Sequence, residues 1–202
     1  ANQWRGATII EPPEVMDRCT SLANLTEKDG PAKPLEMVML GTMSTEKGQL
    51  DAVRAVGLAR DVGVPLELTF YGDTDKAGLR ALEQLISQLR LDDLVRHRGP
   101  TTSPMAVLAE ADVSVVCSMN EAYGRITAES LLAGTPVIGY ALGGTVEILS
   151  HGGGVLVSPA PVHLATAMAR VATDPEKFAG LRAAAMRRRE APDQFGDAGR
   201  TL

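Results

Sequence analysis

The chain has 202 residues, which is enough for one large domain or two small ones. A net charge of −5 and an aromatic content of only 3% argue against a general nucleic-acid-binding protein, since such proteins are normally basic. No apolar run approaches the roughly 20 residues that cross a bilayer, and no secretory leader is recognisable. The two cysteines, Cys19 and Cys117, make neither a disulfide framework nor a metal cluster. These features predict a cytoplasmic globular protein with no transmembrane segment and no nucleic-acid partner.

Three regions are expected along the chain. Residues 1–34 are expected to be a leading segment or linker, in which residues 7–10 form a candidate strand and the Gly- and Pro-containing stretch 26–34 forms a loop. Residues 35–190 carry a regular alternation of apolar runs and helical patterns, and we expect them to form one domain. Residues 191–202 are expected to be a loose C-terminal end.

Six short apolar runs in the central region are expected to be strands, at residues 37–41, 66–72, 95–99, 113–118, 136–140 and 154–157. Helices are expected between and after them, at residues 46–62, 79–89, 102–111, 124–133, 144–149, 161–173 and 175–190. This alternation predicts the α/β class, with a doubly wound, Rossmann-like parallel sheet of about six strands and helices on both faces. Ligands bind beyond the carboxyl ends of such strands, so the functional residues should lie in the loops after Leu40, Phe70, Arg98, Ser118 and Tyr140.

The loop after the first core strand places a lysine near a helix start. Residues 41–48 read Gly-Thr-Met-Ser-Thr-Glu-Lys-Gly, which is neither a dinucleotide fingerprint nor a Walker A loop. Lys47 is placed where a cation can reach a phosphate held at the sheet edge. The alternative is a helix capped by Ser44 or Thr45 and followed by an exposed lysine.

The segment with the most candidate residues covers residues 118–137. Glu121 precedes an expected helix and Glu129 lies about two turns into it. Eight helical steps of roughly 1.5 Å would separate the two carboxylates by about 12 Å, too far for the paired carboxylates of a glycoside hydrolase. They therefore contact different parts of one elongated ligand, such as sugar hydroxyls, or they are unrelated. In the second case Glu121 favours the helix dipole and Glu129 is a solvated helix residue.

The order of these segments resembles the C-terminal donor domain of retaining glycosyltransferases of family 4, which have the two-domain GT-B fold. The resemblance covers about residues 35–170, and its specific part runs from Glu121 to Glu147. That part holds the Glu-x7-Glu pair, then Ala-Gly-Thr-Pro-Val, then Gly-Gly-x-x-Glu. The lysine loop and the Gly-Asp pair at residues 72–73 precede it in the family's order.

The resemblance implies a role for each matching position. Glu121 would contact hydroxyls of the donor sugar, and Lys47 would neutralise the charge that grows on the leaving diphosphate, so these two are the expected catalytic residues. Glu129 would accept hydrogen bonds from the ribose, and the loop from Arg98 would contact the nucleobase, largely through its backbone. The expected donor-binding residues are Gly41, Thr42, Lys47, Gly72, Arg98, Pro100, Thr101, Glu121, Ala122, Tyr123, Gly124, Arg125, Ile126 and Glu129.

The implied reaction transfers a sugar from a nucleotide-diphosphate sugar with retention of configuration and needs no metal or other cofactor. Two departures from the family matter. Thr42 stands where the family usually has arginine, and threonine lacks the guanidinium fork that binds a phosphate with two hydrogen bonds. The N-terminal acceptor domain has no counterpart in the 202 residues, so this chain is expected to bind a donor without transferring sugar. Peripheral membrane association of a full-length protein stays compatible with the sequence.

Two alternative functions follow from the same residues. One is a non-catalytic or degenerate nucleotide-sugar-binding module, because of Thr42. The other is a sugar-nucleotide epimerase of the same fold, but the histidines His97, His151 and His163 are scattered rather than clustered with carboxylates.

Overall fold

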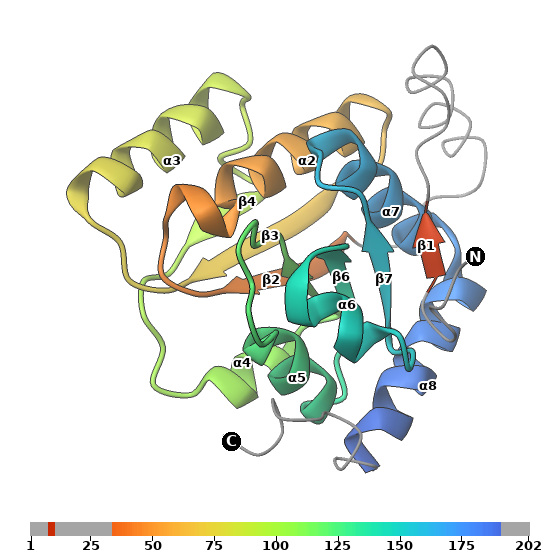
Figure 1. Ribbon diagram of the computed structural model, residues 1–202. Coiled ribbons are helices and arrows are strands. Elements are labelled where there is room, and N and C mark those ends of the chain that lie inside the picture. The colour runs from red at the N-terminus through yellow and green to blue at the C-terminus, as the bar shows by residue number, and fades with distance from the viewer. Residues whose placement is uncertain (1–7, 11–33, 191–202) are drawn as a thin grey trace.

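A computed structural model describes residues 8–10 and 34–190 of the chain. Seven parallel strands form one sheet in the order β1-β7-β6-β5-β2-β3-β4 (Figure 1). The strands are β1 (Thr8–Ile10), β2 (Leu35–Leu40), β3 (Leu66–Tyr71), β4 (Val95–His97), β5 (Val113–Val116), β6 (Val137–Tyr140) and β7 (Gly154–Val157). The six expected strands of the central region are all present. The candidate strand expected at residues 7–10 is present as β1, which adds a seventh strand at the edge next to β7.

Helices lie on both faces of this sheet. One face carries α2 (Gln49–Asp61), α3 (Lys76–Gln88) and α7 (Pro161–Thr173). The opposite face carries α4 (Pro104–Glu110), α5 (Arg125–Leu132) and α6 (Gly143–Leu149). Helix α8 (Pro175–Glu190) contacts both faces, because its first half packs beside α7 and its second half packs on α5. The chain runs outward from β2 to β4 and then returns beside β2 with β5. This reversal makes the sheet doubly wound, as expected, and places the switch point at the carboxyl ends of β2 and β5.

The centre of the sheet is buried on both sides. Every residue of β5, β6 and β7 is buried, which explains why these runs contain almost no charged side chains. On one face, small residues of α2 such as Ala52 and Val56 pack in the same core cluster as Ala165 and Met168 of α7. This packing fixes the strand ends from which the site loops emerge.

The helix expected over residues 46–62 is interrupted near its start. A single 3-10 turn, η1 (Thr45–Lys47), is followed by Gly48 in the left-handed conformation at φ 73°, and only then does α2 begin. A Cβ atom at Gly48 would lie 2.4 Å from the carbonyl oxygen of Cys117. The break is therefore a place where two loops approach so closely that only glycine fits.

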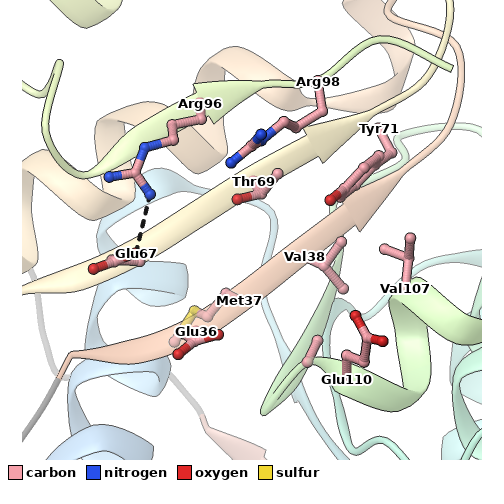
Figure 2. Close-up of a pocket in the computed structure, with 11 residues that line it drawn as sticks. Glu36, Met37, Val38, Glu67, Thr69, Tyr71, Arg96, Arg98, Val107 and Glu110 are labelled. Carbon is pink, nitrogen blue, oxygen red and sulfur yellow. Dashed lines mark hydrogen bonds and ion pairs between the residues drawn. The ribbon is translucent and has the colours of Figure 1, made fainter. Parts of the chain in front are cut away.

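The outer strands differ from the expectation that helices cover both faces. In β3, Leu66, Leu68 and Phe70 are buried, whereas the intervening Glu67, Thr69 and Tyr71 are only partly buried. These partly buried side chains line a pocket of about 220 Å³ on the face that α4 flanks (Figure 2). There Nη1 of Arg96 donates to Oε2 of Glu67 at 3.2 Å. This part of the sheet has one polar face, because the crossover helix α4 returns toward β5.

Several expectations fall on parts of the chain that the structure does not describe. These are Cys19, most of the leading segment 1–34 and the C-terminal end 191–202. Cys117 is fully buried, and burial raises the pKa of its thiol, so the thiol stays protonated. Within residues 8–10 and 34–190, no helix has both the length and the apolar character needed to cross a membrane.

Candidate functional site at the carboxyl edge of the sheet

The loops after β2 and β3 are tied together by their backbones. The amide of Gly41 donates to the carbonyl of Tyr71 at 2.9 Å, and the amide of Met43 donates to the carbonyl of Asp73 at 2.8 Å. A Cβ atom on Gly72 would come within 2.0 Å of the carbonyl oxygen of Gly41. The contact between these loops therefore accounts for a glycine at position 72 without a ligand. The expected donor role of Gly41 and Gly72 stays a prediction.

The lysine loop joins the loop after β5. The amide of Met119 donates to the carbonyl of Glu46 at 2.7 Å, and Gly48 packs on Cys117 as described above. These contacts place Nζ of Lys47 3.1 Å from Oε2 of Glu121. The two side chains are 38% and 13% exposed, respectively. The fold thus pairs the two expected catalytic residues, although 74 positions separate them in the sequence.

Glu121 is held by its backbone as well as by its side chain. Its carbonyl oxygen accepts the amide of Gly144 at 2.9 Å, and Oε1 accepts the amide of Gly124 at 3.2 Å. A Cβ atom on Gly143, whose φ is 50°, would lie 1.8 Å from the Glu121 carbonyl oxygen. Gly143 and Gly144 therefore allow α6 to begin directly against the loop that carries Glu121.

Helix α5 points its amino-terminal end at the same loop. Gly124 is the residue before the helix, and no side chain caps the exposed amides of the first turn. Those amides and the helix dipole create a positive electrostatic potential beside Lys47 and Glu121. The arrangement can bind an anion through one ammonium group and several backbone donors.

The structure tests the alternative view of Glu129 as an ordinary solvated helix residue. Its side chain is only 16% exposed, and Oε1 lies 3.6 Å from Nε of Arg125, whose side chain is 71% exposed. Desolvation raises the pKa of the Glu129 carboxyl, and the charge of Arg125 opposes that shift. Glu129 is therefore a partly buried carboxylate whose oxygens can accept hydrogen bonds from a ligand. The carboxylate of a surface glutamate would instead be hydrated by water.

The remaining predicted residues divide into two groups. Thr42, Ala122 and Tyr123 are exposed in the loops around the Lys47–Glu121 pair, with Tyr123 at 71%. Ile126 is half-buried and packs against two core clusters, so its side chain is structural, and its expected donor role stays a prediction.

The loop after β4 is farther from this pair. The side chain of Arg98 extends over the polar sheet face into the pocket of Figure 2, beside Thr69. The hydroxyl of Thr101 accepts the amide of Ser103 at 3.1 Å, and Pro100 is exposed. Any contact of Arg98 with a nucleobase would therefore come from its backbone, and the role of this loop stays a prediction.

Sequence reasoning missed two buried polar residues that support the lysine loop. Gln49 is 3% exposed, and its Nε2 donates to the carbonyl of Thr42 at 3.2 Å. The hydroxyl of Tyr140 donates to Oδ2 of Asp51 at 3.1 Å, and burial raises the pKa of that phenol, so it stays a donor. Both residues could have been found in the sequence as polar side chains at apolar positions of a helix or strand. Such a side chain is buried and therefore needs a hydrogen-bond partner inside the protein.

A family model described as glycosyl transferases group 1 matches residues 24–188. The chain belongs to this family. It is 37% identical over 118 residues to D-inositol 3-phosphate glycosyltransferase of Thermomonospora curvata, a match that covers 55% of this chain and 27% of the relative. It is 30% identical over 189 residues to 2-deoxystreptamine glucosyltransferase of Streptomyces kanamyceticus, covering 91% of this chain and 46% of the relative.

The solved structure of Anabaena HepE in complex with UDP-glucose superposes on this chain with a TM-score of 0.74 at 21% identity. The superposition covers 95% of this chain and 52% of HepE. The chain therefore spans about half or less of the length of these relatives. The matches confirm the expected resemblance to the C-terminal half of retaining family 4 glycosyltransferases with the GT-B fold.

Proposed function

We propose that this chain is the donor-binding half of a glycosyltransferase that moves a sugar from a nucleotide-diphosphate sugar to an acceptor with retention of configuration. The observation that carries the proposal is the meeting of Lys47, Glu121 and the amino-terminal end of α5 at the switch point of the sheet. An ammonium group and free amides suit a diphosphate, and a carboxylate suits sugar hydroxyls. HepE, with the same fold, has been solved with UDP-glucose, which makes UDP sugars the first donors to test.

In this proposal the leaving diphosphate is stabilised without a metal ion. Lys47 and the amides of residues 122–125 would stabilise the negative charge that accumulates on the diphosphate as the glycosidic bond breaks. Glu121 binds hydroxyls of the sugar, and Glu129 accepts hydrogen bonds from the ribose. The loop at residues 98–101 contacts the base through backbone groups. Removing divalent ions with EDTA should leave the donor affinity unchanged.

We further propose that these residues bind a donor but do not transfer its sugar, because a GT-B enzyme binds its acceptor with a second domain. The alternative is a degenerate binding module, and the exposed Thr42 favours it, since no guanidinium stands at that position. Transfer by a longer protein that retains Thr42 would exclude the degenerate module. Turnover by these 202 residues alone would contradict the role of the second domain.

The deciding experiment is a calorimetric and thermal-shift screen of UDP, GDP and ADP and their glucose derivatives. A ligand present at a hundredfold its Kd should add about 2.7 kcal/mol of stability. Binding of at least one nucleotide, weakened in Lys47→Ala, is the expected result. Failure of all six ligands to bind the folded chain would refute a donor-binding function.

A further inference from the structure

The groups proposed to hold the diphosphate already hold an anion within the chain. Oε2 of Glu121 lies 3.1 Å from Nζ of Lys47, and Oε1 accepts the amide of Gly124 at 3.2 Å. The Lys47 ammonium and the Gly124 amide are here called the anion subsite. The Glu121 side chain is only 13% exposed, so its carboxylate has little contact with solvent in this subsite.

We infer that the Glu121 carboxylate is an internal competitor, which a diphosphate must displace from the anion subsite. This inference rests on the proposed function and adds a second role for Glu121 beyond binding the donor sugar. The Gly124 amide has one hydrogen to donate, so it cannot serve the carboxylate and a phosphate oxygen together at full strength. A diphosphate beside an undisplaced carboxylate would also meet a like charge at close range.

The displacement needs only a rotation of the Glu121 side chain. Its backbone is fixed, because the carbonyl accepts the Gly144 amide at 2.9 Å and Gly143 leaves no space behind it. The carboxylate therefore moves between two sets of partners, with the anion subsite on one side and ligand groups on the other. Displacement leaves a partly buried carboxylate in need of hydrogen-bond donors.

Sugar hydroxyls are such donors, and this gives the exchange a consequence for the reaction cycle. A complete nucleotide sugar supplies hydroxyls to the displaced carboxylate and recovers the hydrogen bonds that it lost. A free nucleoside diphosphate, which is the product, supplies none, so Glu121 competes to regain Lys47 and Gly124. The same residue thus favours the donor over the spent nucleotide and promotes product release.

The test measures the affinity of the wild-type chain for inorganic pyrophosphate, UDP and UDP-glucose by calorimetry at fixed ionic strength. The variants are Glu121→Gln, Glu121→Ala, Lys47→Ala and the double variant Glu121→Gln/Lys47→Ala. Glu147→Gln is the matched control, because it removes the same charge from an exposed position on α6. Two substitutions at position 121 guard against a local folding defect, which thermal unfolding would reveal.

Loss of a partly exposed ion pair predicts that pyrophosphate and UDP bind about two- to fivefold more tightly to both position-121 variants. UDP-glucose should gain less than UDP or bind more weakly, so the preference for donor over product shrinks. In the Lys47→Ala background the gain in affinity should shrink to the part that comes from the Gly124 amide. Simple charge repulsion would instead give the same gain in both backgrounds and would overturn the inference. Glu147→Gln should leave the affinities for all three ligands unchanged.

The outcomes separate this inference from the proposed function. If the wild-type chain binds UDP and the position-121 variants bind it no more tightly, the competitor role is refuted while the donor-binding function stands. If pyrophosphate and UDP bind only the variants, the internal competitor is supported directly. If no form of the folded chain binds any of the three ligands, both the inference and the proposed function fail.

Discussion

Replacing glycine by alanine should have opposite effects on stability at two positions, Gly48 and Gly57. The first is expected to destabilise the protein and the second to stabilise it. Gly48→Ala adds a Cβ atom 2.4 Å from the Cys117 carbonyl oxygen and 2.7 Å from its Cβ, at a φ of 73°. Real Cβ contacts do not fall below 3.0 Å, so the lysine loop has to move away from Cys117. The left-handed conformation costs alanine about 1–2 kcal/mol, and the forced shift costs a similar amount. We expect a loss of about 2–4 kcal/mol of unfolding free energy.

Gly57→Ala is the matched control within α2. Its added Cβ atom would meet Leu89 and Leu91 at 3.5 and 3.7 Å, which are ordinary contacts. Alanine is the better helix former, so this variant should be about 0.5–1 kcal/mol more stable than the wild-type chain. Urea unfolding at equal denaturant slopes measures both changes. A neutral or stabilising effect of Gly48→Ala would refute the tight contact between the two loops.

The same displacement carries a binding consequence. Moving the lysine loop away from Cys117 also separates Lys47 from the Gly124 amide, the other half of the anion subsite, since Gly48 directly follows the lysine. Gly48→Ala should therefore weaken pyrophosphate binding, while Gly57→Ala leaves the affinity unchanged. Equal affinities in both variants would show that the anion subsite does not depend on this contact.

Three further predictions concern the donor site. Glu129→Ala should weaken UDP binding about tenfold, the loss of a charged hydrogen bond, and should leave pyrophosphate binding unchanged, because only UDP carries a ribose; an unchanged UDP affinity would exclude the ribose role. Thr42→Arg should tighten pyrophosphate binding about tenfold, because it adds a guanidinium group. Thr45→Arg adds the same charge to the same exposed loop and should tighten binding less. Equal gains in both variants would point to non-specific attraction. Because desolvation raises the pKa of Glu129 above 4.5, the folded chain retains this proton at pH values where the unfolded chain has released it, so this group's contribution to stability falls as the pH rises above 4.5. Glu129→Gln has no carboxyl to titrate, so its unfolding free energy relative to wild type should rise as the pH rises. If urea unfolding gave the same pH dependence for both proteins, the raised pKa of Glu129 would be contradicted.

The secondary structure was largely readable from local patterns. Each of the six expected strands is present, because a strand buried on both faces requires a continuous apolar run. Glu67, Thr69 and Tyr71 alternate with buried leucines and phenylalanine, and this period of two was a visible sign that β3 has one polar face. The break in the helix at Gly48 was not readable, because its cause is the backbone of Cys117, far away in the sequence.

The alternation of apolar runs and helical patterns determined the fold class, and the order and spacing of the motifs determined the family and the loops in which we expect the site. These properties depend on local periodicity and on residue types at short separations, which a sequence states directly. Only the tertiary structure decided that Lys47 pairs with Glu121, that the side chain of Arg98 lies over the polar sheet face, and that Gly143 fits against the Glu121 carbonyl. Those relations depend on how parallel crossovers bring distant loops to one sheet edge, and their distances are set by close packing of backbones and not by any local preference.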